Sequence, residues 1–432
     1  IRFNNVVAYN RYCNNINHIP IRYFSIPIPI IEKKTRLMFL GTPEFAATAL
    51  KSLVDNENKY NYEIVAVTTQ PACPINGMTD VAKLAKKLSL DCYTPIKPND
   101  TTYLYDIQTI VKPDLCLTVA YGGFLPTKFL EIPKYGVYNI HPSMLPLYRG
   151  AAPLQRCLEN GDKSTGVTLL QTVLKMDAGD VVDQVPYQLN GHERANHLLI
   201  HLFNIGLELF YKHYNSIVSS DDEANSDSDS DAVPIQSILT PQDEKHVTHA
   251  NKINSNEHII DFKTMSGSDI YNKYRGYYNK PGVKCAAHYY QHQNKGKSKS
   301  NSNNNNNSDG NSDIGGVGKR ININLKINHM FMISNVNNSD TTNNSPTDTG
   351  TNTTNNNIDS DAIPINQYVY IKPTKNNQYI DNDNNIIKYP FYVIKCIDGC
   401  FIGLSEIQQD TKKNMLSKDF YNGIRKQTLF YE

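Results

Sequence analysis

Short apolar segments alternate with helical segments between residues 36 and 190 of the chain. The apolar segments are rich in β-branched residues, which is typical of strands buried on both faces of a parallel sheet. We predict such strands at residues 36–41, 64–68, 114–120, 136–140 and 167–173. Helices are predicted between them, at residues 42–54, 80–88 and 103–111. This alternation predicts an α/β domain with a parallel sheet wrapped by helices.

Two loops of this predicted domain follow buried strands, at residues 121–126 and 139–150. Sheets of this type bind their ligands beyond the carboxyl ends of the strands. We therefore expect the functional site of the domain at these two loops.

The pattern changes after residue 217, where the predicted first domain (residues 36–217) ends. Residues 218–233 are an acidic run of Ser, Asp and Asn, too polar to bury a core, and predict a linker. Within the second region, residues 234–432, short strands are predicted at residues 285–290, 320–327, 368–372 and 391–404. Asn-rich tracts at 291–318 and 334–361 are predicted to be disordered insertions. Short strands with polar loops predict a small antiparallel β-barrel.

The length, charge and composition of the chain exclude several classes of protein. A chain of 432 residues is too long for one hydrophobic core. The net charge of +1 gives no global field for polyanions, so a nucleic-acid site must be local. No run of about 18 apolar residues occurs, so no membrane-spanning helix is predicted. Only Cys396 and Cys400 of the eight cysteines lie close in sequence, and we interpret all eight as reduced thiols without metal.

The first 36 residues contain six basic side chains and one acidic side chain. They also contain Ser, Tyr and Asn without strong periodicity. This composition suits an organelle transit peptide, which we place at residues 1–35. The alternative is a disordered extension without a targeting role.

A carboxamide, an imidazole and a hydroxyl lie at the end of the predicted strand at residues 136–140 and directly after it. Asn139 and His141 are two residues apart, so in a strand both side chains point to the same side. These groups suit transfer of a formyl group to an amine. The carboxamide or a protonated His can stabilise the oxyanion that develops, and the imidazole can move protons between the two nitrogens.

The loop at residues 175–180 follows the predicted strand at 167–173 and contains two carboxylates. We expect Asp177 to orient His141 and to favour its protonated form, and we expect Asp180 nearer the next strand. Taken singly, each residue also has a structural interpretation. Asn139 and Ser143 could cap a turn, and His141 could be an ordinary loop histidine.

Longer motifs surround these residues. Residues 36–190 resemble the folate-dependent formyltransferases, which share the Asn-x-His motif and a later catalytic Asp. The branch that acts on methionyl-tRNA is most similar, through the motifs Phe39-Leu-Gly-Thr-Pro-Glu-Phe-Ala46, Val119-Ala-Tyr-Gly122, Arg149-Gly-Ala-Ala-Pro153 and Gly166-Val-Thr-Leu169. Beyond the acidic run, Pro241-Gln-Asp-Glu244, Ile260-Asp-Phe262 and Lys413-Asn-Met415 are similar as well. The resemblance implies a Rossmann-like sheet domain followed by a small OB-like barrel that helps to hold tRNA.

The resemblance also implies a mechanism and partners. Asn139, His141 and Asp177 would be catalytic. The folate site would be formed by Ser143, Met144, Leu145, Pro146, Tyr121 and Gly122. The co-substrate would be 10-formyltetrahydrofolate, without a metal, and the acceptor the amine of initiator methionyl-tRNA. Together with the basic N-terminus, this predicts an enzyme of translation initiation in the mitochondrial matrix, acting as a monomer without membrane contact.

The chain departs from the family pattern at two places. The segment 72–78 has no basic residue where the family carries a basic loop that contacts tRNA, and Leu147 stands where the family often has Arg. Phosphate contacts supply much of the affinity for nucleic acids, so other cations should compensate. We expect these at Arg149, Lys273 and Arg275. Two alternatives stay open, namely a formyltransferase for another amine (glycinamide ribonucleotide or a sugar amine) and an inactive relative that binds tRNA or folate.

Overall fold

The computed structural model describes residues 33–74, 77–97, 99–219, 233–278, 280–291, 319–333, 367–372, 379–380, 386–387, 390–409, 412–424 and 429–431. All structural statements below concern these residues. The predicted transit peptide up to residue 32, the acidic linker at 220–232 and nearly all of both Asn-rich tracts lie outside them.

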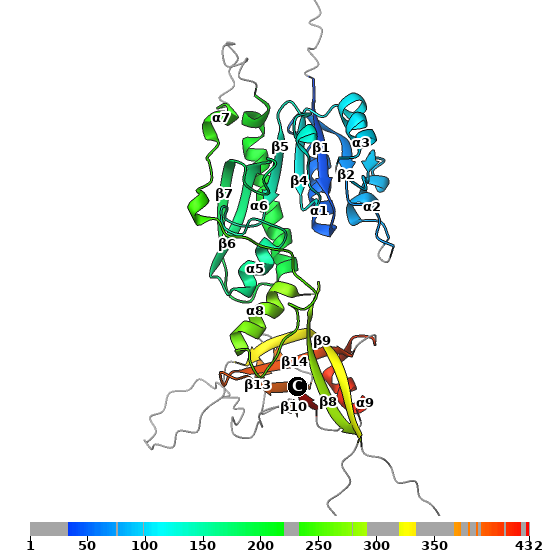
Figure 1. The fold of residues 1–432 in the computed structure, drawn as a ribbon, viewed down its shortest axis with the longest axis vertical. Coiled ribbons are helices and arrows are strands. Elements are labelled where there is room, and N and C mark those ends of the chain that lie inside the picture. Colours follow the sequence, from blue (N-terminus) through cyan, green and yellow to red (C-terminus); the bar gives the residue numbers. More distant parts are fainter. Residues whose placement is uncertain are drawn as a thin grey trace, which may run out of the picture. The chain divides into compact units, whose positions relative to one another are not determined.

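The first half of the described chain forms a seven-stranded sheet in the order β3-β2-β1-β4-β5-β6-β7 (Figure 1). Its strands are β1 (Thr35–Gly41), β2 (Tyr62–Thr68), β3 (Cys92–Tyr93), β4 (Leu115–Val119), β5 (Val137–His141), β6 (Ser164–Gln171) and β7 (Val181–Gln188). Its helices are α1 (Glu44–Asp55), α2 (Asp80–Lys87), α3 (Thr101–Asp106), α4 (Thr127–Leu130), α5 (Pro153–Glu159) and α6 (Ala195–Val218). A π-helical turn, η1 (Ile107–Val111), continues α3.

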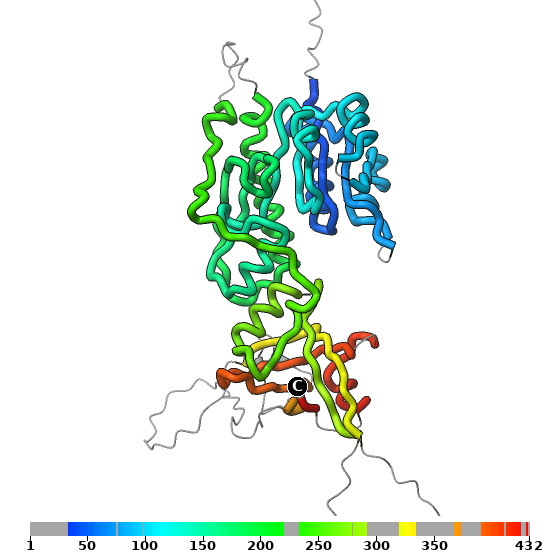
Figure 2. Tube along the Cα trace, in the orientation of Figure 1, coloured from blue at the N-terminus to red at the C-terminus, as the bar shows by residue number. Residues whose placement is uncertain are grey.

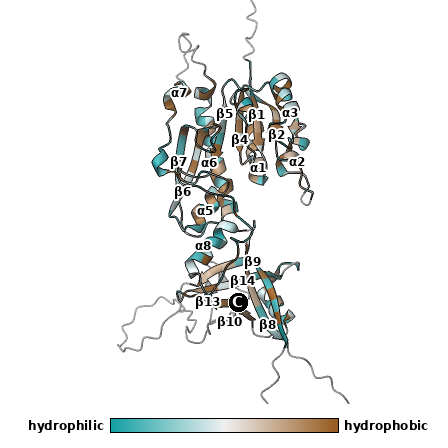
Figure 3. Cartoon of the chain, viewed as in Figure 1, coloured by the Kyte–Doolittle hydropathy of each residue, from teal (hydrophilic) through white to brown (hydrophobic). Residues whose placement is uncertain are grey.

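Strand β1 shows why the apolar segments are continuous. Leu37 and Phe39 pack into the core cluster that includes residues of α1 and α6. Met38 and Leu40 point to the opposite face and join the cluster that includes residues of α3, η1 and α4. Because successive side chains of a strand alternate between faces, a strand covered on both sides must be apolar at every position. Figure 3 shows the resulting hydrophobic centre of the sheet.

The predicted parallel sheet is confirmed, and antiparallel strands extend it at one edge. Strands β1 to β5 pair in parallel, whereas β6 pairs antiparallel with both β5 and β7. The direction of pairing depends on the path of the chain through α5, which the apolar character of a strand does not encode. The consequence is a tight connection between β6 and β7, residues 172–180, which contains Asp177.

The second half contains a closed six-stranded antiparallel barrel in the order β13-β10-β16-β8-β9-β14, closed by pairing of β13 with β14. The barrel strands are β8 (Val283–Gln291), β9 (Lys319–Ile333), β10 (Gln367–Ile371), β13 (Phe391–Lys395), β14 (Phe401–Gln409) and β16 (Leu429–Tyr431). Shorter elements are α7 (Ile235–Ile238), η3 (Glu244–His246), α8 (Gly267–Tyr277), β11 (Tyr379–Ile380), β12 (Ile386–Ile387), β15 (Met415–Leu416) and α9 (Ser417–Gly423). The predicted antiparallel barrel is therefore confirmed.

One predicted barrel strand, residues 391–404, is a hairpin instead. The chain turns between Cys396 and Cys400, where the backbone nitrogen of Cys396 donates to the oxygen of Cys400 at 2.8 Å. Gly399 adopts φ +81, which side chains other than glycine rarely tolerate. The apolar residues on both sides of this turn hid it in the sequence.

Among the described residues, no helix has both the length and the apolar character needed to cross a membrane. The cysteines that the structure describes are not joined by disulfide bonds.

Candidate active site

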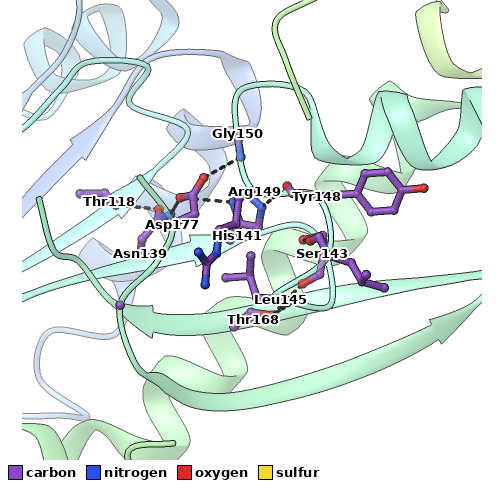
Figure 4. Close-up of polar contacts among 12 residues, drawn as sticks. Thr118, Asn139, His141, Ser143, Leu145, Tyr148, Arg149, Gly150, Thr168 and Asp177 are labelled. Carbon is purple, nitrogen blue, oxygen red and sulfur yellow. Dashed lines mark hydrogen bonds and ion pairs between the residues drawn. The ribbon is translucent and has the colours of Figure 1, made fainter. Parts of the chain in front are cut away.

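Asn139 and His141 lie at the end of β5, and the amide of Asn139 has a fixed orientation. The hydroxyl of Thr118 on the neighbouring strand β4 donates to Asn139 Oδ1 at 2.7 Å. This leaves Asn139 Nδ2 facing Asp177, with its nitrogen 3.4 Å from Oδ1 (Figure 4). A hydroxyl can donate or accept, whereas an ionised carboxylate only accepts, so it is Asp177 that requires the nitrogen end of the carboxamide to face the site.

His141 is 4% exposed and lies between two oxygen atoms. Its Nε2 is 3.0 Å from the backbone oxygen of Tyr148, and its Nδ1 is 3.6 Å from Asp177 Oδ1. A carbonyl oxygen can only accept, so Nε2 carries the hydrogen in this contact. The ring is therefore held by a backbone group on one side and faces a carboxylate on the other (Figure 4).

Asp177 lies at the centre of the group. It adopts φ +51, a left-handed conformation that Asp and Asn tolerate better than most side chains. Its Oδ1 faces Asn139 and His141, while its Oδ2 accepts a hydrogen bond from the Gly150 nitrogen at 2.9 Å. Asp180, by contrast, lies directly before β7 and uses its backbone oxygen to accept from Gln171. The structure thus brings together the three residues whose catalytic role we predict.

A cavity of about 390 Å³ opens beside these side chains. The loop at residues 120–125 forms one wall, residues 172–174 and 176–177 form another, and Leu199 and Phe203 of α6 complete the lining. Its surface is mostly apolar with a few convergent polar groups, which is the usual character of a small-molecule site. Tyr121 and Gly122, both predicted folate contacts, line this cavity.

The other predicted folate contacts do not line this cavity. Ser143 is fully buried, and its hydroxyl donates to the backbone oxygen of Leu147 at 2.7 Å. Met144 packs against the backbone of Gly166, and Leu145 is 5% exposed. Pro146 uses its backbone oxygen to accept from Thr248. Their contact with folate stays a prediction, while their visible role is to shape the loop that follows His141.

The predicted tRNA cations form contacts within the protein. Arg149 is 3% exposed and donates to Gln242 and to Glu244. Hydrogen bonds from Lys175 and from Arg149 lower the pKa of the Glu244 carboxyl. Each partner of Arg149 comes from the segment just after the acidic run.

The two cations of α8 are also engaged. Lys273 forms an ion pair with Glu159 at 3.1 Å. Arg275 is 2% exposed, donates to Asn272, and lies 3.9 Å from Glu193. Burial lowers the pKa of the Arg275 guanidinium. The role of these residues toward tRNA stays a prediction, and their geometry supports packing of α8 against the sheet domain.

Sequence reasoning assigned no role in the site to Thr118, Tyr148 or Gln242. Thr118 occupies a buried strand position, where it resembled any other core residue. Tyr148 acts through its backbone oxygen, which carries no side-chain signal. Gln242 lies in a motif that the resemblance already included, but nothing in the sequence placed that motif beside Asp177.

Known proteins place this geometry in a family. A family model described as Formyl transferase matches residues 35–200, a range that includes all three central residues. A curated methionyl-tRNA formyltransferase from Kosmotoga olearia is 35% identical over 253 residues, which are 57% of this chain and 75% of that protein. The chain belongs to the methionyl-tRNA formyltransferase family.

Other members of the methionyl-tRNA formyltransferase family match similarly. The protein of that name from Thermotoga maritima is 33% identical over 58% of this chain and 74% of its own length. Among solved structures, an N-formyltransferase from Helicobacter canadensis, in complex with folinic acid and dTDP-3-aminofucose, has a TM-score of 0.47 and 15% identity. That match covers 87% of this chain and 100% of the other.

Proposed function

We propose that this protein transfers the formyl group of 10-formyltetrahydrofolate to the amine of initiator methionyl-tRNA. The observation that carries the proposal is the contact of Asp177 with both Asn139 and His141 inside a cavity of ligand size. Membership of the methionyl-tRNA formyltransferase family names the donor and the acceptor. An amide, an imidazole and a carboxylate at one centre are the groups that amide exchange requires.

The reaction exchanges one amide for another. The acceptor nitrogen bonds to the formyl carbon, the bond from that carbon to the donor nitrogen breaks, and one proton moves from the acceptor nitrogen to the donor nitrogen. Asn139 Nδ2 donates to the oxygen on which negative charge develops, and one such donor contributes about 2.7 to 4 kcal/mol to the transition state. His141 assists the proton transfer, and Asp177 holds His141 and the amide in their relative positions.

We assign the folate ring system to the cavity wall formed by residues 120–125. Thr42 donates its hydroxyl hydrogen to the backbone oxygen of Tyr121 at 2.7 Å, so the Thr-Pro-Glu-Phe motif holds the loop at residues 120–125. A Cβ on Gly123 would lie 2.5 Å from the Tyr121 ring and 2.6 Å from Gln70. Only glycine therefore fits at this position of the cavity wall.

We place this activity in the mitochondrial matrix, where it would serve translation initiation by a monomeric enzyme. The support is the basic composition of the first 36 residues. Fusing residues 1–36 to a fluorescent protein should direct it to mitochondria, and replacing the six basic residues by Gln should abolish the import. Diffuse fluorescence of the unaltered fusion would contradict this placement.

A two-acceptor assay tests the activity. Purified protein with 10-formyltetrahydrofolate should formylate methionyl-tRNA and leave glycinamide ribonucleotide unchanged. Preference for glycinamide ribonucleotide or for a sugar amine would contradict the proposed acceptor. Absence of transfer to any amine, with folate or tRNA still bound, would support the inactive alternative.

A further inference from the structure

The chain beyond the acidic run returns to the catalytic loops. We call residues 240–250 the return segment, and Figure 2 shows it in green after α7. Thr240 pairs with Val181 through two backbone hydrogen bonds of 2.8 and 2.9 Å, next to the loop of Asp177. Further along, Ala250 donates to the Arg149 oxygen at 2.7 Å, next to Gly150. The return segment therefore contacts both loops that meet at the Asp177 carboxylate.

Gln242 of this segment contacts the Asp177 turn directly. Its Nε2 donates to the backbone oxygens of Asp177 at 2.8 Å and of Gly179 at 2.7 Å. These two carbonyls belong to a crowded turn, because a Cβ on Gly179 would lie 1.8 Å from the backbone oxygen of Gln171. One carboxamide therefore bridges two carbonyls of the turn that presents the carboxylate.

Arg149 determines the orientation of the Gln242 amide. Its Nε and Nη2 both donate to Gln242 Oε1, at 3.0 and 2.8 Å. A guanidinium has no acceptor, so the oxygen end of the amide must face it and the NH₂ end must face the turn. Glu244 adds a second connection, since it accepts from Arg149 at 2.9 Å and from Lys175 at 2.7 Å.

We propose that Gln242 is a positioning residue for formyl transfer. It fixes the turn that places the Asp177 carboxylate against His141 and Asn139. Arg149 keeps the Gln242 amide in the orientation that this requires. The inference rests on the proposed function. The turn needs outside support because Asp177 sits at φ +51, a conformation that costs energy unless the surroundings maintain it. The hydrogen bond to the Asp177 backbone oxygen comes from Gln242, not from the catalytic side chains.

The first test compares two glutamine variants. Gln242→Leu removes both donors to the turn, whereas Gln188→Leu removes a similar amide-to-carbonyl hydrogen bond, from Gln188 to the Lys163 oxygen, outside the cavity lining. We expect Gln242→Leu to lower kcat about tenfold to a hundredfold, since small misplacements of catalytic groups cost up to about 10² in rate. KM for both substrates should change less than about threefold. Gln188→Leu should leave kcat unchanged.

A double-mutant cycle asks whether Gln242 acts through Asp177. In an Asp177→Asn background, Gln242→Leu should lower kcat by less than about twofold, because residues that act through one group are not additive. Full additivity would overturn the inference, since a general loss of structure lowers the rate in either background. A change confined to KM would overturn it as well.

Amide hydrogen exchange separates this inference from the proposed function. Peptides covering residues 172–180 should exchange faster in Gln242→Leu than in the unaltered protein, and at the unaltered rate in Gln188→Leu. If the unaltered protein formylates no methionyl-tRNA, the proposed function fails, and exchange still decides whether Gln242 holds the turn. If exchange at residues 172–180 is unchanged in Gln242→Leu, the inference is overturned whatever the acceptor is. If the enzyme is active, faster exchange in this variant without a loss of kcat also overturns it.

Discussion

The backbone nitrogen of Gly150 donates a 2.9 Å hydrogen bond to Oδ2 of Asp177. One carboxylate thereby joins the loop that follows β5 to the turn between β6 and β7. Since Oδ2 is fixed by a backbone group, the other oxygen is left to face His141 and Asn139. The two carboxylate oxygens therefore have different partners, a backbone group for Oδ2 and two side chains for Oδ1.

Replacing Asp177 by Asn removes the charge of the side chain and keeps its shape, so it tests what the charge contributes to turnover. Asn also tolerates φ +51, and its oxygen can still accept from Gly150, so the fold should persist. We expect kcat for formylation to fall about 10²-fold, because the proton-transferring His141 loses its anionic partner. Single-turnover formylation and thermal unfolding should be measured together. Unchanged turnover would show that the role given to Asp177 is wrong.

Replacing Asn139 by Ala should mainly affect the chemical step. Loss of one oxyanion donor typically lowers kcat by about 10² to 10³. The variant Thr118→Val serves as a graded control, since it keeps the carboxamide and removes the hydroxyl that orients it. We expect a smaller loss for Thr118→Val. An effect of Asn139→Ala on KM alone would argue for substrate binding instead of oxyanion stabilisation.

Gly150 should tolerate no side chain. A Cβ there would lie 2.5 Å from the backbone oxygen of Ala250, whereas a Cβ on Gly191 would meet no atom within 4 Å. Both glycines have a positive φ, so alanine introduces backbone strain at either position. The comparison of Gly150→Ala with Gly191→Ala therefore tests the contact with Ala250. We expect Gly150→Ala to lower the free energy of unfolding, measured by urea denaturation, by at least about 1 kcal/mol more than Gly191→Ala does. Equal midpoints would mean that the return segment adjusts freely.

Arg275 should matter for stability, independently of its predicted role toward tRNA. Its removal leaves Glu193, which is 10% exposed, without its cation, and breaking such a buried pair typically costs about 3 kcal/mol. We expect Arg275→Ala to lower the unfolding free energy by a similar amount. The salt dependence of KM for tRNA tests the predicted tRNA role separately, because loss of a phosphate contact would reduce its slope by about one. The exposed barrel residue Lys284, changed to Ala, provides the control for stability.

The ion pair of Arg156 with Glu257 should make stability depend on pH. The hydrogen bond from Arg156 is the first cause of a Glu257 pKa lowered to about 2. A lowered pKa stabilises the fold above the ordinary value of 4.5, and this contribution is lost as the pH falls toward 2. Glu257→Gln should therefore be less stable than the unaltered protein at pH 7, and the difference should shrink at pH 3. The pair is partly exposed, so we expect less than about 1 kcal/mol.

Much of the sheet was predictable because a strand that is buried on both faces must consist of consecutive apolar residues. The expected strand at 64–68 is β2 (Tyr62–Thr68), and the expected helix at 80–88 is α2 (Asp80–Lys87). The antiparallel direction of β6 was not predictable, since strand direction follows from the path of the chain. The two-residue strand β3 was missed because it is too short to show any period.

In the site, too, local features could be predicted from the sequence, whereas contacts between distant residues could not. The spacing of Asn139 and His141 places both on one side of a strand, which is a local property, and the family resemblance implies their catalytic role. Gln242 was missed as a partner of Asp177 because 65 residues separate the two, and a contact at that distance has no local pattern. The tRNA role of Arg149 rests on its neighbourhood in the sequence and stays a prediction. Its contacts with Gln242 and Glu244 have no local pattern, because 93 and 95 residues separate them from Arg149.

The return segment has a practical consequence for dividing this chain. By composition, the acidic run after Val218 is the obvious place to cut. A fragment ending there would retain all seven strands of the sheet but would lack Gln242, Thr248 and Ala250. Exchange of the barrel between relatives should therefore use a junction after Ala250, so that each catalytic half keeps its own return segment.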